Sequence, residues 1–139
     1  MKRRRYLVAA GTSAAVSLGG CLGLTPAEET NYDVGMAPAS FDPAELTVSV
    51  GDEVVWENTS SRTHTVTAYE DGIPDGATFF ASGGYENEQA AREAWSETLA
   101  GGIEAGERFT HTFEVAGEYQ YFCIPHEKGG MRATVVVEE

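Results

Sequence analysis

Short runs in which apolar and polar residues alternate, separated by turns rich in glycine and asparagine, constrain this chain more than any other feature. Residues 46–50 alternate between branched apolar and polar side chains, and residues 107–115 repeat the pattern with aromatic residues on one side. Residues 63–69 alternate again, and further strands are expected at 53–57, 118–123 and 132–138. A two-residue period is typical of strands that bury one face. With 139 residues, the chain is expected to form a single all-β domain, either a sandwich or a barrel.

One segment departs from the strand pattern. Residues 86–99 are rich in alanine, glutamate and glutamine, and their apolar side chains fall on one helical stripe, formed by Ala91, Trp95 and Leu99. Asn87 is suited to cap the start of a helix, and Gly101-Gly102 to end it. We therefore expect one short helix inserted between two strands, packing Trp95 over the edge of the sandwich. The alternative is that this insertion docks a partner.

The first twenty residues have the features of an export signal. A basic start, Lys2 to Arg5, precedes an apolar run from Tyr6 to Gly20. Fifteen residues of helix reach about 22 Å, which is short of the roughly 30 Å hydrocarbon core of a membrane. The pattern predicts a signal peptide over 1–20, and its consecutive arginines resemble a twin-arginine signal.

The end of the signal, Leu18-Gly19-Gly20-Cys21, is similar to a lipobox, in which the cysteine is acylated and becomes the first residue. On this interpretation Cys21 is the lipidation site and residues 21–31 form a tether. Residues 32–139 then form a domain on the cell membrane, facing the exterior. The alternative is an ordinary cleaved signal that happens to contain a cysteine.

Acidic residues dominate the charge of the chain, with 22 acidic and nine basic side chains and a formal net charge of −13. Four of the basic residues lie in the signal, so the exported part has five basic and 22 acidic residues, a net charge of −17. This charge argues against a nucleic-acid partner. Concentrated salt would screen it, since the Debye length falls to about 3 Å near 1 M. We expect a halophilic source; an acidic docking face for a basic redox partner is a second, compatible explanation.

A short loop near the C-terminus carries metal-binding side chains of three types. Cys123 is followed by His126 three residues later and by Met131 after five more. A thiolate, an imidazole and a thioether together suit copper, whereas zinc has little use for a thioether. Because the chain has only two cysteines, assigning Cys21 to the anchor and Cys123 to the metal leaves no disulfide.

A trigonal copper site of this type needs a second histidine, and the two candidates are His64 and His111. His64 follows a polar, loop-like run and opens a strand, a position that can face the rim of the sandwich. His111 lies in the middle of a strand with Phe109 and Phe113 on its face, which is typical of a structural histidine. The pattern favours His64.

The Cys-x₂-His-x₄-Met loop, the upstream His64 and the blocks Phe41-Asp42-Pro43 and 47–56 resemble the plastocyanin family of type 1 copper proteins. Within it the chain is most similar to the halocyanins, the lipid-anchored haloarchaeal members. The resemblance implies a cupredoxin fold, a Greek-key sandwich of about eight strands, and an electron-shuttling role. It implies one copper with equatorial ligands His64, Cys123 and His126 and with Met131 axial.

Two positions depart from the family pattern. Many relatives follow the first ligand histidine with asparagine, whereas this chain has Thr65, whose hydroxyl could brace the loop instead. Plant plastocyanins have a tyrosine before the ligand cysteine, a remote point of electron entry; here that residue is Phe122, and we expect Tyr121 to face the other way. We therefore expect electron transfer through His126, beside Pro125 and two glycines.

These observations favour a one-electron carrier that serves redox partner proteins at the membrane, as a monomer. An enzyme is disfavoured because the ligand set leaves no position for a small-molecule substrate, and one remaining histidine is too few for a second copper centre. The alternative is a copper storage or delivery module, or a non-redox cupredoxin-like interaction domain.

Overall fold

The computed structural model describes residues 31–139, of which Tyr32–Glu139 form one folded unit. The expected signal peptide (1–20), the lipidation site Cys21 and the tether up to residue 30 lie outside the described residues. No helix within 31–139 is both long and apolar enough to cross a membrane.

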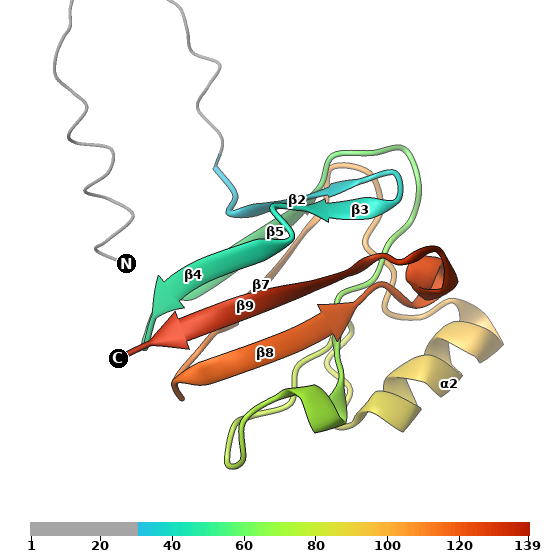
Figure 1. The fold of residues 1–139 in the computed structure, drawn as a ribbon. Coiled ribbons are helices and arrows are strands. Elements are labelled where there is room, and N and C mark those ends of the chain that lie inside the picture. Colours follow the sequence, from blue (N-terminus) through green and yellow to red (C-terminus); the bar gives the residue numbers. More distant parts are fainter. Residues whose placement is uncertain (1–30) are drawn as a thin grey trace, which may run out of the picture. The chain divides into compact units, whose positions relative to one another are not determined.

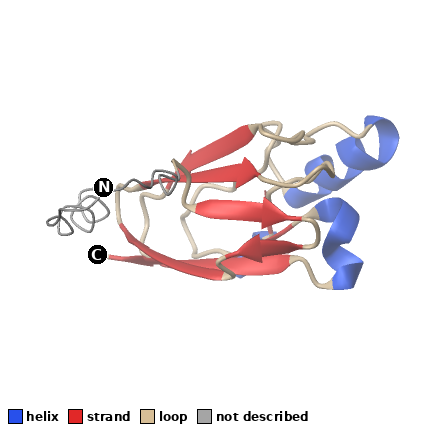
Figure 2. Ribbon diagram, turned by 90° about the horizontal axis from the view of Figure 1, so that it is seen from above, coloured by secondary structure: helices blue, strands red, loops and turns tan. Residues whose placement is uncertain are grey.

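Eight strands form two four-stranded sheets, which are the two layers of a sandwich (Figures 1 and 2). The first sheet, in the order β3-β2-β5-β7, consists of β3 (Ser40–Asp42), β2 (Val34–Ala37), β5 (Glu53–Asn58) and β7 (Arg108–Thr112). The second, in the order β4-β9-β8-β6, consists of β4 (Glu45–Ser49), β9 (Arg132–Glu138), β8 (Gly117–Phe122) and β6 (Thr67–Ala68). The predicted all-β sandwich of about eight strands is confirmed.

Alternation along the strands supplies the core between the sheets. In β9, Ala133, Val135 and Val137 are buried while the intervening residues are not. Trp56 of β5 is fully buried, and its indole ring contacts one aromatic ring from each sheet, Phe109 and Tyr121, and two from connecting segments, Phe80 and Phe113. Aromatic clusters of this kind contribute packing energy beyond their area. The core therefore fixes the two sheets against each other and holds the loops at their ends.

The stretch 63–69, expected as one strand, is regular only at Thr67–Ala68. His64 lies before it and makes an isolated bridge with Ile103. The residues from Thr65 to Ala68 are all buried, so the alternation in their sequence does not correspond to one exposed and one covered face.

The inserted helix, α2 (Glu88–Thr98), is present but shorter than the expected 86–99. The Asn87 side chain accepts a hydrogen bond from Ala90 N at 2.8 Å, so the predicted cap is confirmed. The helix ends at Leu99, which has a left-handed conformation with φ 60°, and not at the glycine pair. This turn takes Leu99 off the apolar stripe: Ala91 is buried and Trp95 partly covered, but Leu99 is 64% exposed.

Two short 3₁₀ segments complete the structure, η4 (Glu70–Gly72) and η5 (Ile124–Gly129). The α2 helix and η5 lie at the same end of the sandwich, away from the C-terminus (Figures 1 and 2). This end carries the side chains considered next.

Candidate metal centre

Two connections at one end of the sandwich carry the four residues expected to bind copper. Cys123 directly follows β8, His126 lies in η5, and Met131 directly precedes β9. His64 comes from a different loop and is held by a reciprocal backbone pair with Ile103: His64 N donates to Ile103 O at 3.2 Å, and Ile103 N to His64 O at 2.7 Å. Hydrogen bonds to a buried neighbouring segment thus fix a ligand that lies outside regular structure.

His64, Cys123 and His126 converge, with their ligand atoms all within 4.8 Å of one another. The Nδ1 atom of His64 lies 3.5 Å from Cys123 Sγ, and the Nδ1 atom of His126 lies 3.4 Å from the same sulfur. One ion can bridge atoms at this spacing, because first-row metals bind nitrogen and sulfur at about 2.0–2.3 Å. His64 and Cys123 are fully buried, whereas His126 is partly exposed.

Met131 belongs to the same loop and is fully buried. Its backbone joins the two ends of that loop, because Cys123 N donates to Met131 O at 3.1 Å and Met131 N donates to His126 O at 3.2 Å. These bonds close the segment 123–131 into a compact turn. The spacing of the sequence motif therefore keeps Cys123, His126 and Met131 together in one loop.

His111 lies elsewhere. It is in β7 opposite Val54, stacked on Phe80 at a ring-centroid distance of 4.5 Å. It is not part of the cluster of His64, Cys123 and His126. The choice of His64 over His111 as the second candidate ligand agrees with this placement.

Burial keeps the cluster uncharged when no metal is bound. Burial, and secondarily the neighbouring His126, lowers the pKa of His64 to about 4, and burial also lowers the pKa of His126. Burial raises the pKa of the Cys123 thiol, although hydrogen bonds from Thr65 and His126 partly offset this effect. At neutral pH two neutral imidazoles therefore face a protonated thiol, and a metal ion must displace only the thiol proton.

Thr65 braces the loop through its side chain, as the sequence suggested. Its hydroxyl accepts a hydrogen bond from Ile124 N at 2.8 Å, and its own amide donates to Cys123 Sγ at 3.4 Å. The second bond directs an amide dipole at the sulfur, which favours a thiolate. Thr65 thus links the His64 segment to both the ligand cysteine and the residue after it.

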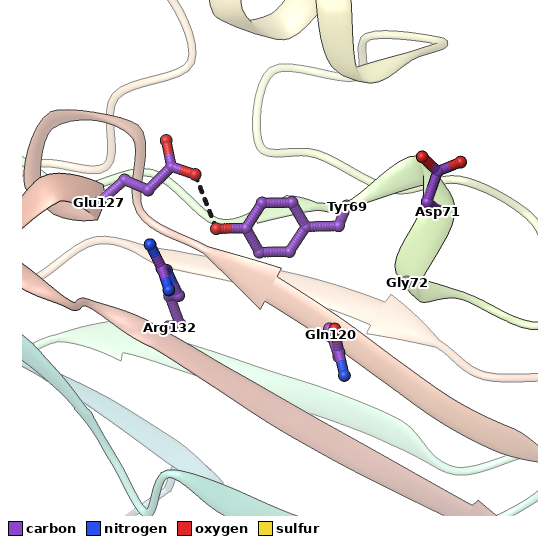
Figure 3. Close-up of a pocket in the computed structure, with 6 residues that line it drawn as sticks. All are labelled: Tyr69, Asp71, Gly72, Gln120, Glu127 and Arg132. Atoms are coloured by element: carbon purple, nitrogen blue, oxygen red, sulfur yellow. Dashed lines mark hydrogen bonds between the residues drawn. The ribbon is translucent and has the colours of Figure 1, made fainter.

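Phe122 and Tyr121 face opposite sides of β8, as expected for consecutive strand residues. Tyr121 is part of the core between the sheets, whereas Phe122 stacks on Tyr69 at 4.3 Å. Tyr69 in turn donates its hydroxyl hydrogen to Glu127 Oε2 at 2.7 Å, across the pocket drawn in Figure 3. Tyr69 therefore covers the side chain of Phe122, the residue before Cys123, on the face of β8 that points away from the core.

Sequence reasoning missed two groups of residues that support the ligands. Arg92 of α2 forms an ion pair with Glu127. Because 35 residues separate the two, no local sequence pattern predicts this contact. Ser60 Oγ lies 3.0 Å from His64 Nε2, and Ser60 in turn binds Asn58. Asparagine side chains commonly accept a hydrogen bond from the backbone two residues later, so Asn58 in the sequence could have indicated this turn.

The donor set fits copper. One thiolate sulfur, two imidazole nitrogens and a nearby thioether combine soft and intermediate donors, and the two imidazoles each present Nδ1 to the same sulfur. The elements that position them are β8, η5 and the Ile103 bridge.

Comparisons with known proteins point the same way. The family model for copper-binding proteins of the plastocyanin/azurin family matches residues 27–138. The chloroplastic plastocyanin of Tetradesmus obliquus is 30% identical over 128 residues, covering 91% of this chain and 79% of that protein. The plastocyanin of Scenedesmus fuscus is 31% identical over 98 residues, covering 70% of this chain and 86% of that protein.

Two solved structures share the fold. An oxidised amicyanin mutant has a TM-score of 0.54 and 27% identity, covering 76% of this chain and 79% of that one. Pseudoazurin from Methylobacterium extorquens AM1 has a TM-score of 0.54 and 25% identity, covering 76% of this chain and 73% of that one.

Proposed function

The chain belongs to the plastocyanin/azurin family of copper-binding proteins and is a cupredoxin electron carrier rather than an enzyme, and we propose that it works as a membrane-tethered carrier with one type 1 copper. The observation that carries this proposal is the convergence of His64, Cys123 and His126, whose ligand atoms lie within 4.8 Å of one another. Met131, buried in the same loop, is the proposed axial ligand.

The protein supplies a rigid set of donors. When bound, the copper supplies a one-electron change between Cu(I) and Cu(II). Cys123 would bind as thiolate and release its proton on metal uptake. Because the loop 123–131 is closed by its own backbone bonds and braced by Thr65, the donors would keep nearly the same positions in both oxidation states. A small rearrangement favours fast electron transfer.

His126 provides the access from the surface. It is the one partly exposed member of the converging cluster, and Pro125, Gly129 and Gly130 beside it are exposed. A redox partner protein could therefore approach the site here without displacing a large side chain. We propose this face as the point of electron exchange with partners.

The N-terminal sequence supports a proposal for the location of the protein. We propose that residues 1–20 direct export, that Cys21 is acylated, and that residues 21–31 tether a monomeric domain to the outside of the cell membrane. The acidic composition supports a halophilic source, and this combination is similar to the halocyanins. A Cys21→Ala variant is expected to move from the membrane fraction to the soluble fraction of the producing cells, and retention in the membrane would contradict lipidation.

The central test is the visible absorption spectrum of the full chain, titrated with Cu(II) in high salt. We expect an intense blue band that saturates at one equivalent, is absent in Cys123→Ser, and disappears and returns on reduction and reoxidation. A folded protein that stays colourless would contradict the proposal. Copper lost to a mild chelator faster than it can be cycled would favour storage or delivery instead.

A further inference from the structure

The buried side chain of Asn58 has one possible amide orientation. It is 1% exposed, and its Nδ2 lies 2.6 Å from Arg62 O and 2.8 Å from Ile103 O. Carbonyl oxygens only accept hydrogen bonds, so both contacts require the NH₂ group on that side. The Oδ1 atom must therefore face the other way, toward Ser60.

The Ser60 hydroxyl donates its hydrogen bond to this amide oxygen. The Ser60 amide donates to Asn58 Oδ1 at 2.9 Å, and the Ser60 hydroxyl donates to the same atom at 2.8 Å. An amide oxygen cannot donate in return. The other acceptor within reach of the hydroxyl, Arg62 O, is at 3.4 Å and would give a weaker bond. The lone pairs of Ser60 Oγ are left to accept, and one of them accepts from Arg62 N at 3.1 Å.

The remaining contact of Ser60 Oγ is with Nε2 of His64, at 3.0 Å. Since the hydroxyl hydrogen is already directed at Asn58, this contact needs the hydrogen on Nε2. A neutral imidazole has one N–H, so Nδ1 is then the nitrogen with the free lone pair. That nitrogen is the one that faces Cys123 Sγ at 3.5 Å.

We propose that Asn58 and Ser60 are positioning residues that hold His64 in its Nε2–H tautomer, so that Nδ1 faces the metal position with its lone pair free. Only the identification of that position as a copper site rests on the proposed function. The opposite tautomer would require the Ser60 hydroxyl to turn away from Asn58, which loses one hydrogen bond and disfavours that state by roughly fivefold.

The first residue of this hydrogen-bonded chain, Asn58, lies in a rigid part of the fold. Asn58 is the last residue of β5, and its backbone is held on both sides: its amide donates to Glu107 O at 3.0 Å, and its carbonyl accepts from Gly106 N at 2.8 Å. The amide side chain therefore cannot shift easily. Ser60 transmits its orientation from the sheet to a ligand that lies outside any regular strand.

The test is nitrogen-15 NMR of the metal-free full chain with labelled histidine, at neutral pH, where the ring shifts show which nitrogen carries hydrogen. We expect His64 to carry it on Nε2 in the wild type and in Ser60→Thr, and to populate the Nδ1–H tautomer to a larger extent in Ser60→Ala, where the Ala37 backbone remains as a hydrogen-bond partner of the His64 ring. Ser61→Ala, a change at the adjacent exposed serine, is the matched control. The His111 signals in the same spectra report whether each variant is folded.

A second readout is copper affinity, measured by competition with a chelator. Ser60→Ala is expected to lose about 10- to 100-fold, because it removes the hydrogen bond that orients the bound ring and raises its basicity as well as the tautomer preference, whereas Ser60→Thr and Ser61→Ala should stay near the wild type. A wild-type His64 with hydrogen on Nδ1, or an unchanged tautomer in Ser60→Ala, would overturn the proposal. If the tautomer depends on Ser60 but copper does not bind, the positioning role of Asn58 and Ser60 is supported and the proposed function is contradicted.

Discussion

Arg92 on the inserted helix binds Glu127, the residue that directly follows His126, through two hydrogen bonds. Arg92 Nη1 lies 2.8 Å from Glu127 Oε1, and Nη2 lies 3.2 Å from Oε2. The guanidinium carbon also lies 4.4 Å from the ring centroid of Phe122, which precedes Cys123. The helix thus contacts residues adjacent to two proposed ligands, one on each side of the loop.

This pairing predicts opposite shifts of the reduction potential in two variants. Arg92→Gln leaves the Glu127 carboxylate unneutralised, which favours Cu(II) and should lower the potential. Glu127→Gln removes a negative charge from the loop, leaves Arg92 paired with Glu88 alone, and should raise the potential. Each change is expected to amount to about 0.5–1 kcal/mol at a surface-like dielectric, or roughly 20–40 mV, measured by voltammetry in moderate salt.

The double variant, with glutamine at both positions, removes one charge of each sign, so the local net charge equals that of the wild type and the potential should return close to the wild-type value. If both single variants shift the potential in the same direction, the effect comes from loosening of the loop and not from charge. Glu88, which also binds Arg92 at 2.8 Å, offers a control, because within the described residues its carboxylate bonds to Arg92 and to Glu70 N and not to the loop.

Thr65→Val should weaken the site without changing its shape. Valine fills the same space but cannot accept the hydrogen bond from Ile124 N, so that partly buried amide loses its acceptor. We expect a loss of about 1–3 kcal/mol in the free energy of unfolding and about 10- to 100-fold in copper affinity. Thr65→Ser keeps the hydroxyl and should stay close to wild type in denaturant unfolding and chelator competition. Equal affinities for the valine and serine variants would show that the hydroxyl does not brace the site.

The sequence predicted the parts of this molecule that depend on local patterns. Alternation predicts β4, β5, β7, β8 and β9, because each strand buries one face. The spacing of Cys123, His126 and Met131 predicts a shared loop, because so few residues cannot separate widely. The Asn87 cap is similarly local.

What the sequence did not predict depends on contacts between distant segments or on unusual backbone conformations. Arg92 and Glu127 meet because α2 and η5 lie at the same end of the sandwich, which no local pattern encodes. Leu99 ends α2 in a left-handed conformation that disfavours leucine, so a glycine was the better expectation. His64 is positioned by a bridge to Ile103, almost forty residues away, and so it falls outside the strand expected at 63–69.

His111→Phe should make the metal-free protein less sensitive to acid. Burial lowers the pKa of His111 in the folded state, so below about pH 6.5 the unfolded chain binds more protons and the free energy of unfolding falls. Phenylalanine keeps the stacking on Phe80 but does not titrate. Urea unfolding at pH 7.5 and pH 5 should show a smaller difference for the variant, and the blue band should be unaffected. Since His64 titrates in both proteins, an identical pH dependence would mean that His111 is not the group that burial perturbs.

Met131→Leu should retain one copper per chain and the blue band but raise the reduction potential. The thioether of an axial methionine stabilises Cu(II) slightly, so replacing it by a hydrocarbon favours Cu(I), by an amount on the order of tens of millivolts. Leucine is close to methionine in volume, and such exchanges in a core usually cost less than about 1.5 kcal/mol, so the fold should survive. Met36 of β2 is equally buried and lies outside the loop, which makes Met36→Leu a matched control with an unchanged potential. A Met131→Leu potential equal to that of the wild type would show that the Met131 sulfur does not bind copper, and the site would then consist of His64, Cys123 and His126 alone.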